Sequence, residues 1–409
     1  MPSPVKVQAN EKISADFIAE ADAVSAHNYH PLPVVIARGE GVWLYDVEGK
    51  KYLDCLAAYS AVNQGHCHPR IVAALHEQSR TLTLSSRAFH NDRMGPFLKL
   101  LCDYAGYERA LPMNSGAEAV ETALKLARKW GYKIKGIPEG KAEIITAAGN
   151  FHGRTTTIVG FSTEPQYRDG FGPFTPGFVS VPFGDLDALR RAITPHTAAL
   201  LLEPIQGENG IIIPPAGYLK AAAELCKANR VLLILDEIQT GFGRTGRDFC
   251  GDHDGVKGDV LIVGKALGGG VYPVSAALAS AEIMAVIHPG DHGSTFGGNA
   301  LAAAVGEAAL GVLIDERLAE RSATLGDYFM AKLRALDSPN IREIRGRGLM
   351  IGIEIKIESG KARGYCEALM RRGVLCKETH DQVIRLTPPL IIEREQIDWA
   401  VAQLAVVLA

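Results

Sequence analysis

One lysine occupies a position where a lysine can do covalent chemistry. Lys265 follows the apolar run Val260–Gly264 and precedes Gly268-Gly269-Gly270. A lysine near a positive group or in an apolar pocket has a lowered pKa, and its neutral amine can form a Schiff base with an aldehyde. The glycines would leave room for a flat cofactor. Most lysines are simply solvated, so this interpretation depends on the residues that accompany Lys265.

An acidic residue ends another apolar run. Asp236 closes Leu232-Leu233-Ile234-Leu235-Asp236, and ligands of open α/β sheets bind at the carboxyl ends of such strands. Asp236 could hold a cationic ring nitrogen, or a metal ion as in a nucleotide-binding strand. The sequence contains no Gly-x-x-x-x-Gly-Lys-Ser/Thr loop that would support the metal interpretation.

Two further segments place hydroxyls and glycines where a helix begins. Asn114-Ser115-Gly116-Ala117-Glu118 opens a strongly periodic helix, whose free N–H groups and dipole would attract an anion such as phosphate. Ser294 and Thr295 belong to Gly293-Ser294-Thr295-Phe296-Gly297-Gly298-Asn299, which suits a phosphate for the same reason. Each segment alone is equally typical of an ordinary capped helix or turn.

In chain order, these segments supply what pyridoxal 5′-phosphate requires. The helix start would bind the phosphate, and Asp236 would keep the pyridine nitrogen protonated, which makes the ring an electron sink. Lys265 would hold the aldehyde and then carry a proton once substrate displaces it. Phe151, next to His152, could stack on the ring face.

The elements that must position these residues form a predicted α/β sheet. Helical spacing of apolar residues predicts a helix over 116–133 with Ser115 as its N-cap. Short runs that are apolar on both faces predict buried strands in a largely parallel sheet. These strands are expected at 143–147, 178–181, 198–203, 231–236, 260–264 and 274–279, with helices such as 219–229 between them.

The pattern changes after about residue 320 and predicts a smaller α+β domain. Its elements are strands at 341–345 and 349–357, a helix at 361–372, a strand at 383–386 and a last helix from Glu393. We therefore expect a large cofactor-binding domain over 59–320 and a small C-terminal domain over 321–409. Residues 1–58 are expected to contribute to the small domain.

Composition excludes several classes of protein. The 409 residues are 47% hydrophobic and 22% charged, as in globular proteins, and a net charge of −3 argues against a nucleic-acid partner. No apolar run is long enough to cross a membrane. The seven scattered cysteines and the acidic, signal-free N-terminal residues predict free thiols and a cytoplasmic location. No second ligand pair accompanies His66-Cys67-His68 at zinc-like spacing, so no metal site is predicted.

Longer motifs carry a family resemblance. They are Asn28–Pro33, Tyr59–His66, Leu126–Tyr132, Gly149–Arg154, Glu203–Glu208, Asp236–Gly241, Gly264–Leu267 and the Arg-Leu-Thr-Pro-Pro segment at Arg385. With these motifs the chain resembles the class III aminotransferases, and within them the ornithine δ-transaminating enzymes, from about Asn28 to the C-terminus. The resemblance implies a fold-type I transferase, with a mostly parallel seven-stranded sheet in the large domain.

The resemblance also implies roles for the cofactor residues. Lys265 is the imine lysine, Asp236 pairs with the pyridine nitrogen, and Gln239 hydrogen-bonds the phenolic oxygen of the ring. His152 stands beside the stacking Phe151, where many relatives have an aromatic such as Trp. The phosphate is bound by Ser115, Gly116 and Ala117, and from the neighbouring subunit by Ser294 and Thr295. Shared active sites imply a homodimer, alone or within a higher oligomer.

Five residues are implied to select the substrate. Arg154 binds the carboxylate remote from the reacting carbon, because a planar guanidinium can grip a carboxylate with two parallel bonds. Tyr29 contacts the α-amino end of ornithine and blocks α-transamination. Glu208 masks Arg385 while ornithine is bound and swings away when 2-oxoglutarate brings its α-carboxylate to Arg385. Tyr59 lines the same pocket.

The expected reaction converts L-ornithine and 2-oxoglutarate into glutamate 5-semialdehyde and glutamate, linking arginine and proline metabolism. The substrates are small molecules, with no nucleic-acid or membrane partner. The first alternative is an N-acetylornithine or 4-aminobutyrate aminotransferase of the same class. Two others stay open: a nucleotide-binding protein with magnesium at Asp236, and a scaffold that binds the cofactor without turnover.

Overall fold

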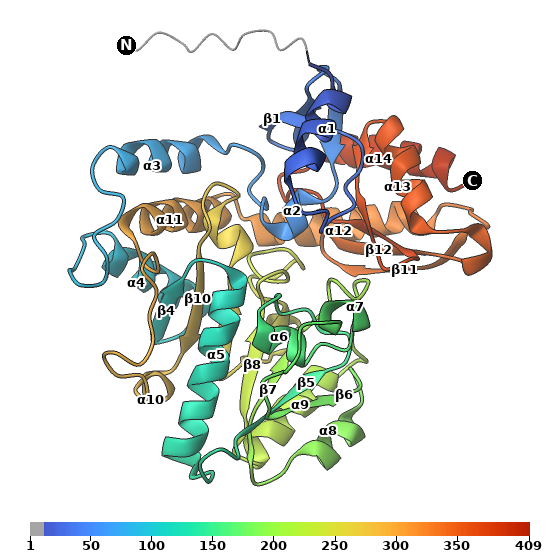
Figure 1. Cartoon of the computed structure of the whole chain (residues 1–409). Helices are drawn as coiled ribbons and strands as arrows, with labels where there is room; N and C mark the ends of the chain where they lie inside the picture. The colour runs from blue at the N-terminus through green and yellow to red at the C-terminus, as the bar shows by residue number, and fades with distance from the viewer. Residues whose placement is uncertain (1–11) are drawn as a thin grey trace.

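The computed structural model describes residues 12–409, in which helices surround three sheets (Figure 1). The strands are β1 Ile36–Glu40, β2 Trp43–Asp46, β3 Lys51–Asp54, β4 Arg109–Met113, β5 Glu143–Ala147, β6 Phe178–Val181, β7 Thr197–Leu202, β8 Leu232–Asp236, β9 Val260–Val263, β10 Ser275–Ala279, β11 Ile341–Arg347, β12 Met350–Ile355, β13 Val374–Leu375, β14 Lys377–Thr379 and β15 Val383–Leu386.

Helices connect and cover these strands. The α-helices are α1 Ser14–Val24, α2 Ala57–Ser60, α3 Pro69–Ser79, α4 Met94–Ala105, α5 Gly116–Trp130, α6 Thr156–Gly160, α7 Pro165–Arg168, α8 Leu186–Ala192, α9 Tyr218–Ala228, α10 Ala281–Met284, α11 Ala300–Asp315, α12 Leu318–Arg334, α13 Ala362–Arg371 and α14 Arg394–Val407. The short turns of other helix types are η1 Gly131–Lys135, η2 Cys250–Asp254, η3 Lys265–Gly268 and η4 Ile357–Ser359.

The large sheet confirms the predicted seven-stranded, mostly parallel architecture. Its strand order is β4-β10-β9-β8-β7-β5-β6, and only β10 runs antiparallel to its neighbours. Alternate residues of β8 face opposite layers: Ile234 packs in the cluster with α5, whereas Leu233 and Leu235 pack in the cluster with α8 and α9. Both faces are therefore buried, which explains why these strands are continuously apolar.

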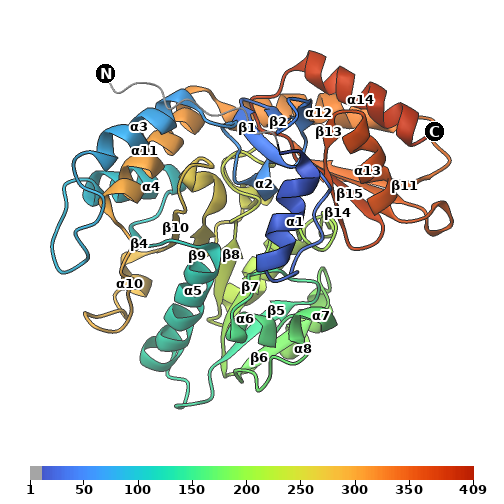
Figure 2. The same cartoon turned by 45° about the horizontal axis from the view of Figure 1, so that its top comes forward.

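The N-terminal and C-terminal parts of the chain share a second sheet. Strands β1, β2 and β3 form an antiparallel ladder, and β13 adds to it in parallel through the pairs Val374–Leu53 and Leu375–Asp54. The third sheet, of order β11-β12-β15-β14, is antiparallel throughout. Figure 2 shows β1, β2 and β13 beside α12 and α14. The domain limits at residues 58 and 320 remain predictions.

The helix expected over 116–133 is shorter than predicted. Its N-terminus is confirmed, because the Ser115 hydroxyl accepts a hydrogen bond from the N–H of Glu118. The α-helix ends at Trp130, and the chain continues into the wider π-helical turn η1. Gly131 begins this turn, and a Cβ there would lie 3.0 Å from the Cβ of Ala198. The missing side chain thus lets the end of α5 approach β7 closely.

Two other expectations concern the chain as a whole. All seven cysteines are free thiols, as predicted. Among the helices of residues 12–409, none has both the length and the apolar character that crossing a membrane requires.

Candidate active site

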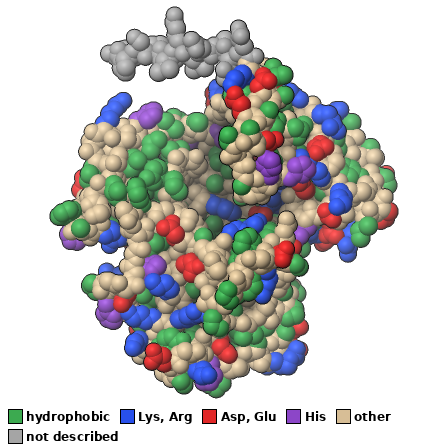
Figure 3. Space-filling view, in the orientation of Figure 1, with side chains coloured by type: hydrophobic (Ala, Val, Ile, Leu, Met, Phe, Trp, Pro, Cys, Tyr) green, Lys and Arg blue, Asp and Glu red, His purple; other side chains and the backbone are tan. Residues whose placement is uncertain are grey.

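The predicted chemistry-bearing residues meet at one edge of the large sheet. Asp236 ends β8, Lys265 follows β9 and Ser115 follows β4, and these three strands point the same way. A cavity of about 220 Å³ lies at this edge, lined by Gly116, Ala117, Phe151, His152, Gly153, Glu203, Ile205, Asp236, Ile238, Gln239, Thr240 and Lys265. In the space-filling view the surface is hollowed at its centre, and basic side chains lie in the hollow (Figure 3).

Asp236 is held in the cavity by two hydrogen bonds. Its Oδ2 lies 2.7 Å from Nδ1 of His152, and its Oδ1 accepts the N–H of Ile238 at 3.0 Å. Because a carboxylate only accepts, Nδ1 of His152 must carry the proton. Burial of His152 opposes a charged ring, but the hydrogen bond and charge of Asp236 outweigh it and raise the pKa of His152. The imidazole N–H of His152 thereby orients the carboxylate of Asp236 in the cavity.

Lys265 combines a strained backbone with a perturbed amine. Its φ of 46° places a non-glycine residue in the left-handed region, a strain that clusters at functional sites. Burial lowers the pKa of the Lys265 amine, although the carboxylates of Glu208 and Asp236 partly oppose this shift. A lowered pKa increases the share of neutral amine, which is the nucleophilic form.

The glycines after Lys265 do not play the predicted role. Gly268, Gly269 and Gly270 are absent from the cavity lining. They serve packing instead: a Cβ on Gly269 (φ +58°) would lie 2.6 Å from Ile71, and one on Gly270 (φ +71°) would lie 2.9 Å from Val62. The expectation that they leave room for a cofactor is therefore wrong, because α3 and the segment before it occupy that space.

The start of α5 forms an anion cradle. The first N–H groups of a helix have no intrahelical acceptor, and Gly116 and Ala117, which begin α5, line the cavity. A Cβ on Gly116 would lie 3.1 Å from Cδ1 of Ile238, so glycine permits the close approach. Ser115 caps the helix through a reciprocal pair of bonds with Glu118.

The loop with Ser294 and Thr295 lies beside this cradle but outside the cavity of its own chain. Nδ2 of Asn114 donates to the Ser294 hydroxyl at 2.8 Å, and Thr295 is exposed. That these hydroxyls reach the phosphate of a neighbouring subunit stays a prediction.

Arg385 and Glu208 form a largely buried ion pair near Lys265. Arg385 donates to Oε1 of Glu208 at 2.6 Å, and its guanidinium lies 4.7 Å from the ring centre of Tyr59. Nε2 of Gln239 also donates to Glu208, at 3.5 Å. Burial alone would raise the pKa of Glu208, but the charges of Arg385 and Lys265 hold it below its ordinary value. Glu208 therefore stays anionic and neutralises Arg385.

Arg154 and Tyr29, the other two predicted substrate residues, are both exposed and lie outside the lining of the cavity. The exposed Arg154 guanidinium stacks 3.7 Å from the ring centre of Tyr167 and makes no ion pair with any carboxylate of residues 12–409. Tyr29 lies between α1 and β1 with 78% of its surface exposed. Tyr29 is nonetheless near Tyr59, whose pKa is raised mainly by burial and partly by this neighbouring phenol.

Two residues outside the predicted set support the cavity. An oxygen of Glu203 accepts the N–H of Phe151 at 2.9 Å, and burial raises the pKa of Glu203 to about 7. The signal that identifies Asp236, an acid at the end of a buried strand, is also present at Glu203. Gly207 makes room for Gln239, because a Cβ at this position would overlap the Gln239 side chain. No sequence pattern indicates that contact.

These groups fit pyridoxal 5′-phosphate. The cavity is lined by the carboxylate residue Asp236, by Lys265 with its amine of lowered pKa and by the first residues of α5, and Phe151 is among the other lining residues. A pyridinium, an aldehyde and a phosphate are the groups that such residues would bind.

Comparison with known proteins defines the class. The family "Aminotransferase class-III" matches residues 24–408, and the chain belongs to this family. Members are pyridoxal-phosphate-dependent, so the protein is a transaminase that uses this cofactor.

Individual relatives are closely similar. The ornithine aminotransferase of Bordetella pertussis is 60% identical over 388 residues, which cover 95% of this chain and 94% of that protein. The crystal structure of Toxoplasma gondii ornithine aminotransferase, with pyridoxal phosphate at partial occupancy, has a TM-score of 0.96 at 46% identity and covers 98% and 95% of the two chains. An acetylornithine aminotransferase from Elizabethkingia anophelis has a TM-score of 0.88 at 47% identity, covering 97% and 99%.

Proposed function

We propose that this protein is an ornithine δ-aminotransferase that uses 2-oxoglutarate as amino acceptor. The observation that carries the proposal is the Glu208–Arg385 pair, which holds a neutralised arginine near Lys265, while Arg154, next to the cavity-lining Gly153, makes no ion pair with a carboxylate of the described residues. Ornithine has one carboxylate, which can bind Arg154. A dicarboxylate such as 2-oxoglutarate can bind Arg154 with one carboxylate and Arg385 with the other. Relatives at 60% and 46% identity carry the name of this activity.

The reaction divides among the residues of the cavity. Bound pyridoxal phosphate supplies an electrophilic carbon and an electron sink. Asp236 keeps the ring nitrogen protonated, and His152 orients Asp236 through its Nδ1–H. With the cofactor bound, Lys265 Nζ would accept the proton from the reacting carbon of the substrate and would donate it to the electrophilic carbon of the cofactor. Phe151, whose N–H is held by Glu203, packs against the ring.

Substrate choice follows from charge. Arg154 binds the ornithine carboxylate and so places the δ-amine, not the α-amine, near Lys265. The phenol oxygen of Tyr29 accepts a hydrogen bond from the α-amino group of ornithine, which keeps that end of the substrate away from the reacting atoms. When 2-oxoglutarate binds, its second carboxylate displaces Glu208 from Arg385. One cavity can thus take both substrates because a single side chain hides or exposes one positive charge.

The test is an incubation with ornithine and 2-oxoglutarate in which o-aminobenzaldehyde traps the product. Glutamate 5-semialdehyde cyclises to pyrroline-5-carboxylate through its free α-amine, and the trap reports the cyclic product. An acetylated α-amine cannot cyclise, so an acetylornithine aminotransferase, which the similar acetylornithine enzyme makes the alternative, gives no signal from its own substrate. Absence of a trapped product from ornithine, with turnover of N-acetylornithine, would overturn the proposal.

A Tyr29→Ile variant tests the discrimination among amines. We expect its kcat/KM ratio for 4-aminobutyrate over ornithine to rise about tenfold, because ornithine loses a hydrogen-bond partner and 4-aminobutyrate has no α-amine to lose. Steady-state kinetics with both amines measures the ratio. The glutamate half-reaction of the same variant is the control. Unchanged ratios would contradict the role of Tyr29.

A Glu208→Gln variant tests the masking of Arg385. Removing the negative charge leaves Arg385 uncompensated, so we expect kcat/KM for glutamate relative to ornithine to rise about tenfold. Single-turnover measurements of the two half-reactions provide the ratio. Glu354→Gln is the matched control, since Glu354 on β12 also pairs with arginines, but with Arg342 and Arg345 on β11 and not with Arg385. Equal changes in both half-reactions would count against masking.

The proposal includes a homodimer with shared active sites and a cytoplasmic location. Support for the dimer comes from the loop at Ser294, which meets Asn114 at the start of α5 and exposes Thr295 and about half of Phe296. An exposed aromatic ring beside a hydroxyl at the edge of the phosphate cradle suits contact with a second subunit.

A further inference from the structure

The segment that carries Tyr29 has little support of its own. Residues 25–35 connect α1 to β1 without regular secondary structure. Their backbone bonds are local, such as Asn28 N–H to Ala26 and Val34 N–H to Leu32, until the carbonyl of Val35 accepts the N–H of Val47 at 3.0 Å. A side chain that must discriminate between amines needs a defined position, so another element has to hold this segment.

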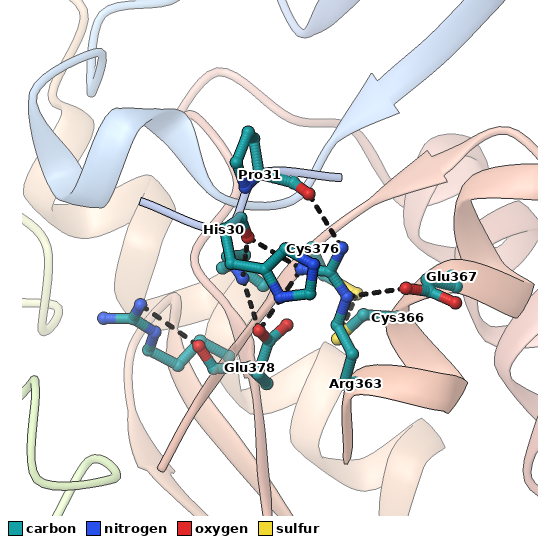
Figure 4. A network of polar contacts seen from close by, with 9 residues as sticks. His30, Pro31, Arg363, Cys366, Glu367, Cys376 and Glu378 are labelled. Carbon is teal, nitrogen blue, oxygen red and sulfur yellow. Dashed lines mark hydrogen bonds and ion pairs between the residues drawn. The ribbon is translucent and has the colours of Figure 1, made fainter. Parts of the chain in front are cut away.

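Two basic residues, Arg363 on α13 and Lys377 on β14, hold the segment with Tyr29. Arg363, on α13, donates from its two terminal nitrogens to consecutive carbonyls, to His30 at 2.9 Å and to Pro31 at 2.7 Å. Nζ of Lys377, on β14, donates to the same His30 carbonyl at 3.2 Å. Within residues 12–409, these are the hydrogen bonds that tie residues 28–33 to elements distant in sequence. Figure 4 shows Arg363 reaching both carbonyls.

Arg363 is itself held by acids on two elements. Its Nε donates to Glu367 at 2.7 Å, one helical turn along α13, and a terminal nitrogen lies 3.5 Å from Glu378 (Figure 4). Glu378 also pairs with Lys377. The Arg363 side chain is only 17% exposed, so water competes weakly for these bonds. A planar guanidinium with acids behind it is a preorganised fork for two carbonyls.

Glu378 also connects Arg363 to the ion pair of Arg385 and Glu208. The carbonyl of Glu378 accepts a hydrogen bond from Arg385 at 3.5 Å, and Arg385 makes the ion pair with Glu208. The next residue, Thr379, donates its hydroxyl to the carbonyl of Glu208. Arg363 and Glu378 thus connect the segment with Tyr29 to β14, the strand that contacts both Arg385 and Glu208.

We propose that Arg363 is a positioning residue that sets specificity for the diamine: it clamps the carbonyls of His30 and Pro31 and thereby fixes Tyr29 over the substrate. This inference rests on the proposed function, because it acts through the role of Tyr29 toward ornithine. Charge-assisted bonds to backbone carbonyls are strong and do not depend on the side chains at positions 30 and 31. Arg363 hydrogen-bonds the segment of Tyr29 directly but reaches Arg385 only through Glu378, so its loss should affect the ornithine half-reaction far more than the glutamate half-reaction.

The experiment compares Arg363→Gln with wild type in the cofactor-loaded protein. We expect kcat/KM for ornithine to fall about tenfold, mainly through KM, while the glutamate half-reaction changes less than about twofold. The ratio of 4-aminobutyrate to ornithine should rise as in Tyr29→Ile. Arg371→Gln, the same change at an exposed position of the same helix, is the matched control and should leave both half-reactions unchanged.

Two further measurements separate positioning from general destabilisation. Amide exchange of a peptide spanning residues 26–34 should become faster in Arg363→Gln and stay unchanged in Arg371→Gln. In a Tyr29→Phe background, Arg363→Gln should cost ornithine little further kcat/KM, because both changes remove the same interaction. Additive losses, or equal losses in both half-reactions, would overturn the inference. A wild-type protein inactive on ornithine would instead overturn the proposed function, whatever the exchange data show.

Discussion

Replacing Lys265 by alanine is expected to lower kcat/KM for ornithine by about 10⁴-fold or more, because the residue both attaches the cofactor and moves the proton. Lys265 is the one lysine among the residues lining the cavity within the described chain, so no neighbouring amine can substitute. The product trap measures the loss of turnover. Borohydride treatment of wild type, followed by mass spectrometry, should place the cofactor on the peptide that contains Lys265.

Lys220→Ala is the control for this prediction. Lys220 is exposed on α9 and is not among the residues lining the cavity, so its replacement should leave turnover and cofactor attachment unchanged. Thermal unfolding of both variants checks that the fold persists. Wild-type turnover by Lys265→Ala, or label on another lysine, would contradict the assignment of Lys265.

The second large effect is expected from Asp236→Asn. Asparagine keeps the shape of the side chain but cannot hold a proton on the pyridine nitrogen, so we expect kcat to fall roughly 10³-fold. The variant also removes the charge that raises the pKa of His152, so that pKa should fall. Single-turnover kinetics measures the first effect, and NMR titration of the imidazole measures the second.

Asp259→Asn is the matched control for Asp236. Asp259 precedes β9 at the opposite end of the parallel strands, and its carboxylate accepts the N–H of Leu233 at 2.8 Å. Asparagine can accept the same bond, so activity should be unchanged. Near-normal turnover of Asp236→Asn with the cofactor still bound would refute the role of Asp236 in stabilising charge on the ring.

Much of the central sheet could be predicted from local patterns. The structure has β5 at 143–147 and β6 at 178–181, as predicted, because strands buried on both faces are apolar throughout and their ends are marked by polar residues. Lys265 and Asp236 were recognisable for the same reason: each is a charged residue next to such a strand. The end of α5 was predicted less well, since the close contact between Gly131 and Ala198 has no local signal.

Other parts of the site depend on residues far apart in the chain. Phe151 is held by Glu203, Gln239 fits only beside Gly207, and the segment with Tyr29 is clamped by Arg363. Gly269, which the sequence associates with the cofactor, serves packing against Ile71. Propensity and periodicity report on neighbours along the chain, so they carry no information about such contacts.

The amino-acid sequence by itself therefore determined the sheet, the family resemblance and the two charged residues at its carboxyl edge, because strand burial and strand ends are encoded in short stretches. Only the tertiary structure decided which side chains neutralise, orient or clamp one another: His152 against Asp236, Glu208 against Arg385, and Arg363 against the backbone beside Tyr29. Hydrogen bonds and charge pairs act over a few ångströms, and folding alone sets those distances.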